Sequence, residues 1–395
     1  MKSLPRALRW TLIGVLLSIL SNDMFEGAFV PATLVFALPV WVIALRENIG
    51  VGLDFLSPVS GWLVSRFGAF TCLAGAEFAE GIMILSLGAW FLLGTPSPML
   101  LVVLACFLLA TGQILDVATE VFEADVAGED DDALVRYSGM VEVASSIVGV
   151  LLGRYLGSVL AIVDVPLMLV VSGVLSLAAA GTRLLVGKGV GSVEEEEDDL
   201  PRTDTSSLRV ASLAPMDRFA LLMSSLLLGL VPSLWVPYTI RSWGETRGET
   251  TMTFAYLASG IGALVASLVF LYFARRIGMR KLARFNLVSA LLGLLLVPLS
   301  FPLAVVGFAL VAAATSGYAQ TVVTSRQLLL RGPVLATFTG HSRLAFAVGA
   351  AAGSIAGWLV SDYVGATLLP FLAAAALLPA LWGARALPKA ATARV

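Results

Sequence analysis

Charged residues are scarce in this sequence, at 13% of the 395 positions, which is about half of their share in a soluble globular protein. Hydrophobic residues make up 58%, and the mean hydropathy is +0.93. A water-soluble fold of this length could not bury that much apolar surface, so we predict an integral membrane protein. Hydrophobic stretches of about 20 residues recur along the chain, which indicates membrane-spanning α-helices.

Histidine and cysteine are also scarce, which limits the chemistry available to the chain. The one histidine is His341, and the two cysteines, Cys72 and Cys106, lie in separate apolar runs. They supply neither a disulfide framework, nor zinc ligands, nor a Ser-His-Asp triad. The nearest match to a phosphate-binding loop, at 181–189, has one residue too many before its Gly-Lys pair. We therefore predict no enzyme activity, no catalytic residue, no cofactor and no metal. The net charge of −2 predicts no nucleic-acid partner.

Hydrophobicity along the chain predicts twelve membrane-spanning helices. With both termini in the cytoplasm, all but five of the 25 Lys and Arg residues fall on the cytoplasmic side, as the positive-inside rule requires. We therefore predict a multi-pass protein of the cell membrane, in contact with the lipid bilayer, with both termini cytoplasmic. The spans are predicted at residues 10–31, 41–64, 70–93, 99–121, 138–162, 165–186, 216–239, 252–274, 282–300, 302–325, 341–361 and 364–383.

A polar stretch divides these spans into six and six. It runs from Arg183 to Arg218 and contains an acidic run at 194–199. We interpret it as a solvated, flexible linker, with a regulatory or metal-binding tail as the alternative. The expected organisation is an N-terminal six-helix bundle at 1–186, a cytoplasmic acidic linker at 187–215 and a C-terminal six-helix bundle at 216–395.

The two halves of the sequence repeat each other. Gly68 follows the second span and Gly278 follows the eighth, 210 residues later, in similar surroundings. Glycines four residues apart in the fifth span recur 200 residues later in the eleventh, and this spacing allows helices to pack closely. Two six-helix repeats are a known plan for transporters, with the solute site between the halves. The packing glycines are Gly149, Gly153, Gly157, Gly349, Gly353 and Gly357.

These motifs make the chain similar to the major facilitator superfamily over essentially its whole length. The signature G-x-L-x-D-R-x-G-R, between the second and third helices of that family, is matched by Gly61, Leu63, Arg66 and Gly68. Ser65 replaces the acid. The repeat copy keeps Arg276, Gly278, Arg280 and Lys281. The resemblance implies an all-α integral membrane protein, with twelve transmembrane helices in two pseudo-symmetric six-helix bundles.

The fifth span is also similar to the antiporter signature G-x-x-x-G-P-x-x-G-G of this family. Its three glycines match, whereas Arg154 stands in place of the proline and Ser158 in place of the last glycine. In such families spans 1, 2, 4 and 5 line the central cavity. The resemblance therefore implies that polar groups on these four spans face the solute.

Ionisable side chains inside the spans are the most informative feature. Each costs about 2.5–3.5 kcal/mol on insertion, so it faces a cavity or a partner. They gather in the first half, where Asp116, Glu120 and Glu123 share one face of the fourth span with the amide Gln113. This one-sided set favours a cation or proton site. The candidates for solute binding and proton coupling are Asp23, Glu26, Asp54, Gln113, Asp116, Glu142 and Arg154.

Structural interpretations compete with these functional ones. Asp23 and Arg154 could form a structural ion pair, and we favour structural pairing for Glu77 and Glu80 near the inner surface. In the second half no acid lies inside a span, and neutral polar and aromatic groups could bind an apolar solute, with packing as the alternative. These candidates are Trp235, Tyr238, Tyr256, Tyr318 and Gln320. We expect His341 in a loop at the start of span 11.

Opposite charges at the cytoplasmic ends of the two halves suggest a gate. Acidic ends of the first half would meet basic ends of the second half when the inner side is closed. Exposed ion pairs contribute only about 0–1 kcal/mol each, so a topology signal with solvated loops is the alternative. The gating and motif candidates are Gly61, Arg66, Gly68, Glu120, Glu123, Arg276, Gly278, Arg280, Arg331 and Arg343.

We predict a secondary active transporter that moves a small organic solute by alternating access. Its acidic first half favours proton coupling, a cationic or amphiphilic solute and export, and we expect a monomer. A facilitator or importer of a neutral or anionic metabolite that uses Arg154 is the first alternative. The second is a non-transporting receptor or a lipid scramblase on the same fold.

Overall fold

The computed structural model describes residues 6–36, 49–50, 52–93, 97–128, 130–194, 215–239 and 249–387. The residues of this described part lie in helices, in turns or in irregular segments, and none of them forms a strand. The helices follow the predicted spans in order, although the second span is described only from residue 49 onward. Nine helices in these ranges are long and apolar enough to cross a membrane.

The helices of the first half are α1 (Arg6–Val35), α3 (Ser57–Phe67), α4 (Ala69–Leu93), α5 (Pro98–Ala127), α6 (Asp131–Ala144), the π-helix η1 (Ser145–Gly153), α7 (Arg154–Val163) and α8 (Val165–Glu194). Those of the second half are α10 (Pro215–Thr239), α12 (Glu249–Ile277), α13 (Met279–Leu296), α14 (Phe301–Leu329), α15 (Gly332–Tyr363), α16 (Leu369–Gly383) and two short 3-10 helices, Ala366–Leu368 and Ala384–Ala386.

The chain forms two compact units, each with one segment from the other half of the sequence. Unit 1 comprises Met1–Ala133, Met140–Ser206 and Arg331–Gly340. Unit 2 comprises Leu134–Gly139, Ser207–Leu330 and His341–Val395. Most of the predicted acidic linker lies outside the described residues, and the part at 187–194 continues helix α8.

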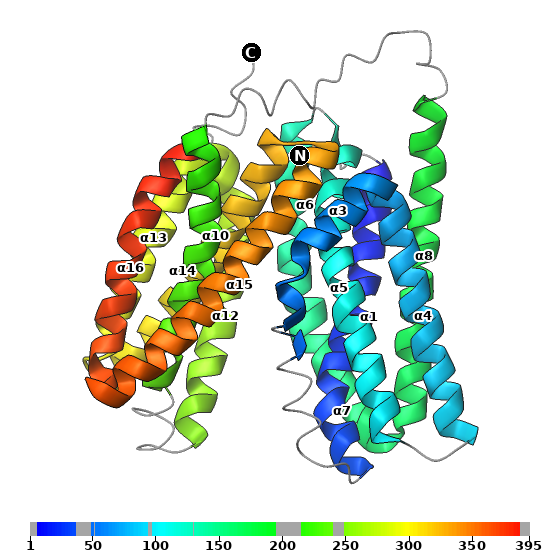
Figure 1. Ribbon diagram of the computed structural model, residues 1–395, viewed down its shortest axis with the longest axis horizontal. Coiled ribbons are helices and arrows are strands. Elements are labelled where there is room, and N and C mark those ends of the chain that lie inside the picture. The colour runs from blue at the N-terminus through cyan, green and yellow to red at the C-terminus, as the bar shows by residue number, and fades with distance from the viewer. Residues whose placement is uncertain are drawn as a thin grey trace. The chain divides into compact units, whose positions relative to one another are not determined.

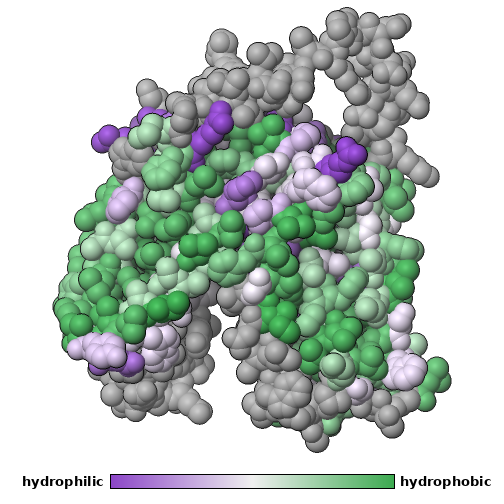
Figure 2. Space-filling model, viewed as in Figure 1, coloured by the Kyte–Doolittle hydropathy of each residue, from purple (hydrophilic) through white to green (hydrophobic). Residues whose placement is uncertain are grey.

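In unit 1, α4 and α1 pack along α8, and α5 packs on α4 (Figure 1). The core of this bundle is apolar and aromatic, with Phe25, Phe29, Ile84, Leu104 and Leu169 all buried. In unit 2, α14 packs on α12 and α13, and α16 packs on α10. On the face that Figure 2 shows, hydrophobic side chains cover most of the described surface, and most hydrophilic ones lie towards the ends of the helices. This distribution suits insertion in a bilayer.

The predicted repeat has a backbone counterpart. Gly68 adopts φ 86° and ψ 147° between α3 and α4, and Gly278 adopts φ 79° and ψ 152° between α12 and α13. Each donates its N–H to the carbonyl four residues earlier, Val64 or Ala274. This region of φ and ψ is essentially restricted to glycine, so both repeats need glycine at the same turn.

Two predictions about elements are wrong. Span 2 was expected as one helix, but its described part turns at Phe55–Leu56, and α3 begins at Ser57. His341 was expected in a loop, but it lies inside α15, which begins at Gly332. The hydropathy pattern reports only the segment that crosses the apolar layer, whereas the helix continues beyond that layer.

Candidate functional site

A break in the second span places a carboxylate beside a polar side chain of α5. Pro58 has no N–H, so it cannot donate to the carbonyl of Asp54, four residues earlier. Ser57 Oγ donates to that carbonyl instead, at 2.5 Å. The side chain of Asp54 then accepts a hydrogen bond from Gln113 Nε2 at 2.6 Å. Because Asp54 is only half-buried, this carboxylate is both held in place and accessible.

Ser57 also connects to the second polar group of the site. Its Oγ lies 3.1 Å from Gln113 Oε1, so Asp54, Ser57 and Gln113 form one network across α3 and α5. Asp54 and Gln113 were both predicted as site residues, and the structure brings them together. Ser57 and Pro58 were missed, although a proline within a predicted span is a sequence signal for a break.

The predicted polar face of α5 divides along its length. Gln113 is half-buried and Asp116 is exposed, whereas Glu120 and Glu123 are buried. Glu120 Oε1 accepts a hydrogen bond from Thr339 Oγ1 at 3.0 Å. The two buried acids are therefore packed in unit 1, whereas neighbouring side chains leave Asp54 partly and Asp116 largely uncovered.

Arg331–Gly340, at the start of α15, packs in unit 1 against α3 and α5. Arg331 donates to the carbonyls of Ala124 and Gly128, at 2.9 and 3.0 Å, where α5 ends. It also lies 3.6 Å from Asp131. A methyl group at Gly340 would lie 2.7 Å from the Ser57 carbonyl oxygen. The contact is thus as close as two backbones allow.

Asp23 and Arg154 form the predicted ion pair, with Arg154 Nε donating to Asp23 Oδ1 at 2.9 Å. The Arg154 side chain is nevertheless 57% exposed, so neighbouring side chains leave this guanidinium group largely uncovered within a predicted span. The pair lies where the π-helix η1 meets α1, and a methyl group at Gly149 or Gly153 would collide with Asp23. π-helical turns occur frequently at functional sites.

The glycines of the fifth and eleventh spans do pack closely. A methyl group at Gly157 would collide with the carbonyl of Met24 on α1. A methyl group at Gly349 would collide with the carbonyl of Leu226 on α10, and one at Gly353 would collide with the carbonyl of Leu230 on the same helix. Gly357 is also buried. These contacts confirm the packing interpretation of both glycine sets.

A second group of charged residues is buried in unit 1. Its members lie on α4 and α8, whereas the Asp54 network lies on α3, α5 and the residues just before α3. Glu77 pairs with Arg183 of α8 at 3.4 Å, and both side chains are 1% exposed. The predicted pairing of Glu77 is therefore confirmed. Glu80 differs, because its side chain contacts Thr111 Oγ1 on α5 rather than a cation. Arg183, which begins the polar stretch in sequence, is buried within α8.

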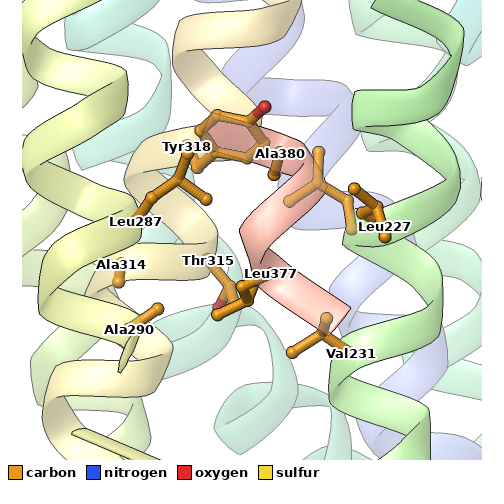
Figure 3. A pocket seen from close by; sticks show the side chains of 10 residues that line it. Leu227, Val231, Leu287, Ala290, Ala314, Thr315, Tyr318, Leu377 and Ala380 are labelled. Carbon is orange, nitrogen blue, oxygen red and sulfur yellow. The ribbon is translucent and has the colours of Figure 1, made fainter. Parts of the chain in front are cut away.

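The aromatic and amide candidates of unit 2 are buried between helices. Tyr318 is 3% exposed and donates to Ser224 Oγ at 2.9 Å. It lines a pocket between α10, α13, α14 and α16 (Figure 3). The cavity volume is about 10 Å³, about the minimum for one water molecule, so it holds no organic solute as it stands. Gln320 is buried and donates to Ser267 Oγ at 3.1 Å.

The remaining candidates take varied positions. The side chains of Trp235, Tyr238 and Tyr256 lie outside the part of the chain that the structure describes. Glu26, Glu142 and Arg343 are half-buried, and Arg66 and Arg276 are exposed. Arg280 Nε donates to the Leu387 carbonyl at 3.1 Å, so this motif residue holds the segment after α16. Gly61 of α3 packs against the carbonyl of Ala336.

Comparisons with known proteins agree with this architecture. The sequence profile of the Major Facilitator Superfamily matches residues 10–334. No curated protein matches the sequence significantly. Among solved structures, the E. coli transporter FucP in its outward conformation gives a TM-score of 0.68 at 14% identity, over 96% of this chain and 97% of that chain.

Two further structures share the fold. A bacterial homologue of the iron transporter ferroportin, in an outward-facing state, gives a TM-score of 0.70 at 17% identity, over 96% of this chain and 99% of that chain. The human organic anion transporter MFSD10 (TETRAN) gives 0.62 at 16% identity, over 96% and 100%. The helical regions of this chain fit the predicted fold of two six-helix bundles.

Proposed function

Since the chain belongs to the Major Facilitator Superfamily and is therefore a membrane transporter rather than an enzyme, we propose that it exchanges protons for a small organic cation. The solute would move by alternating access, as in other transporters built from two repeats. We further propose that the protein works as a monomer in the cell membrane, exports its solute, and has both termini in the cytoplasm.

The observation that carries this proposal is the Asp54–Gln113 contact beside the break in the second span. Interrupted spans mark the binding sites of many transporters, because the free backbone groups and nearby side chains contact the solute. Asp54 offers a half-buried carboxylate whose orientation is fixed by Gln113 at 2.6 Å. A cationic solute and a proton would compete for this carboxylate, and that competition is the physical basis of antiport.

The distribution of charge supports a cationic solute. The spans of the first half carry the carboxylates, including the exposed Asp116, whereas the second half has its acids at or beyond the ends of its spans. A solute that enters an acidic, solvent-accessible site is stabilised when it is positive, because opposite charges attract more strongly where water is partly excluded.

We keep one second candidate, the facilitated transport of an organic anion at Arg154. The guanidinium group of Arg154 is 57% exposed even though it pairs with Asp23, so it retains N–H groups for a carboxylate or phosphate. The receptor and lipid-scramblase alternatives have no comparable observation in their favour.

Proton flux in liposomes tests the proposal. Purified protein would be reconstituted with an internal pH-sensitive dye and exposed, under an imposed pH gradient, to organic cations, sugars, amino acids and carboxylates. We expect cation-dependent proton flux in the wild type, loss of that flux in Asp54→Asn and Asp116→Asn, and retention in the control Asp362→Asn. Asp362 is exposed at the end of α15.

Two outcomes would contradict the proposal. Cation-dependent proton flux that survives Asp54→Asn would remove Asp54 from the coupling site. Uptake of carboxylates without proton flux, abolished by Arg154→Gln and untouched by Asp54→Asn, would instead establish the second candidate.

A further inference from the structure

Glu80 is a buried carboxyl group without a cation beside it. Its side chain is 1% exposed, and it lies one helical turn after Glu77 on α4. Arg183 pairs with Glu77, and the described residues provide Glu80 with no ion pair. Oε1 of Glu80 contacts Thr111 on α5 at 2.5 Å, and Oε2 has no hydrogen-bond partner in the described part of the chain.

The contacts of Thr111 agree with a protonated Glu80. Thr111 Oγ1 lies 2.5 Å from Glu80 Oε1, and 2.9 and 3.2 Å from the carbonyl oxygens of Phe107 and Leu108 in its own helix. A hydroxyl group has only one hydrogen to donate, and neither a carboxylate nor a carbonyl can supply another. If Glu80 carries a proton, its O–H donates to Thr111 and the Thr111 O–H donates to Phe107, so both contacts become hydrogen bonds.

The charges around Glu80 agree with a neutral acid. Arg183 on α8 balances Glu77 on α4. Asp116 on α5, which also acts electrostatically on Glu80, is a further acid and not a cation. An ionised Glu80 would therefore add an uncompensated negative charge to a site in the interior of a membrane protein, where unpaired charges are strongly disfavoured.

We propose that Glu80 is a proton-binding site, held as a neutral carboxylic acid while α4, α5 and α8 pack as observed. When the Thr111 contact opens and water reaches Glu80, the O–H bond of Glu80 breaks, the proton passes to that water and Glu80 is left as the carboxylate. Glu80 would thus hold a second proton in unit 1, in addition to the one that competes with the solute at Asp54. The coupling role of this proton rests on the proposed transport function, whereas its presence does not.

Infrared spectroscopy of the reconstituted full-length chain tests the bound proton without any solute. A protonated carboxyl group has a C=O stretching band that a carboxylate lacks. At neutral pH we expect such a band in the wild type, its loss in Glu80→Gln, its displacement in Thr111→Val, and no change in the control Asp362→Asn. Glu80→Gln resembles the neutral acid in size and polarity, so this variant should fold. A wild-type band that persists unchanged in Glu80→Gln would overturn the proposal.

Transport measurements then test the coupling role. We expect Glu80→Gln to exchange labelled solute across the membrane but to accumulate less of it than the wild type under the same pH gradient. If accumulation stays at the wild-type level while the infrared band is lost, the proton is structural and the coupling role is overturned. If the wild type itself moves no proton with any solute, the proposed antiport fails, but the infrared result still decides whether Glu80 binds a proton.

Discussion

At the scale of single residues, Arg183 is the most constrained side chain of unit 1. It is 1% exposed, donates to the Thr11 carbonyl at 3.1 Å and pairs with Glu77 at 3.4 Å. Its guanidinium group also lies 5.9 Å from the centre of the Phe122 ring. A methyl group at Gly14 of α1 would collide with Thr182 Oγ1 and lie 3.2 Å from the Arg183 guanidinium group, so glycine allows α1 to approach this part of α8. Residues of α1, α4 and α5 thus surround one buried cation of α8.

Removing Glu77, the counter-ion of this cation, together with the neighbouring acid Glu80 should destabilise the protein. The double variant Glu77→Gln/Glu80→Gln leaves Arg183 buried without a counter-ion, which costs about 3–5 kcal/mol. Adding Arg183→Met should restore most of that stability, because the site then holds no charge. Thermal unfolding in detergent measures both effects, with Glu80→Gln alone as the control that should change stability little. Equal unfolding temperatures for the double and triple variants would contradict this account.

The sequence predicted part of this residue-level arrangement. The spacing of Asp116 and Glu120 on α5 and the pairing of Asp23 with Arg154 follow from helical periodicity and from the cost of buried charge. The Arg183 partner of Glu77 could not be predicted, because 106 residues separate the two and helix packing alone decides which residues meet. Thr111 gave no sequence signal, since its importance arises from one contact with Glu80.

At the scale of helices, the turns after α3 and α12 show how the repeat is built. Both turns use a glycine at positive φ, Gly68 at 86° and Gly278 at 79°. Both also continue into the next helix through the same backbone bond, from the N–H of Cys72 or Leu282 to the glycine carbonyl at 3.1 Å. The repeat predicted from the sequence is therefore a repeat of backbone conformation as well.

Substitution of Gly68 isolates this conformational requirement. A methyl group at Gly68 meets nothing within 4 Å, so Gly68→Ala adds no collision, and its cost of about 1–3 kcal/mol is backbone strain alone. Gly75→Ala is the matched control, since Gly75 has the same open surroundings but lies inside α4, where alanine is favoured by about 0.5–1 kcal/mol. Thermal unfolding should move in opposite directions for the two variants. A shift of equal sign would show that the turn does not require glycine.

Hydropathy predicted the helices well and their ends poorly. The span expected at 302–325 runs as α14 to Leu329, and the span expected at 341–361 begins as α15 at Gly332. These extensions carry polar residues such as Arg326 and Arg331, which a hydropathy window excludes. The break at Phe55–Leu56 was hidden for the opposite reason, because both residues are apolar. Only Pro58 indicated it.

At the scale of the whole molecule, each unit contains a short segment from the other half of the sequence. Arg331–Gly340 belongs to unit 1 and Leu134–Gly139 to unit 2. A glycine makes the close contact in both, Gly340 against Ser57 and Gly139 against Leu271. The sequence predicted opposite charges at the cytoplasmic ends of the two halves. It did not predict that each unit would include a segment of the other half, because that depends on which helices pack together in space.

Arg331 is the residue that we expect to control the contact of Arg331–Gly340 with unit 1. It donates to two carbonyls where α5 ends and lies beside Asp131. Cations stabilise that end of a helix and anions do not, so Arg331→Glu should release the segment. A cysteine at Ala336, which is buried, reports this release in a chain without Cys72 and Cys106. Thiol labelling should become faster in Arg331→Glu and stay unchanged in Arg9→Glu, an exposed position with the same change of charge. Labelling that is equally slow in both variants would show that Arg331 does not hold the segment, so that its packing would depend on the glycine contacts alone.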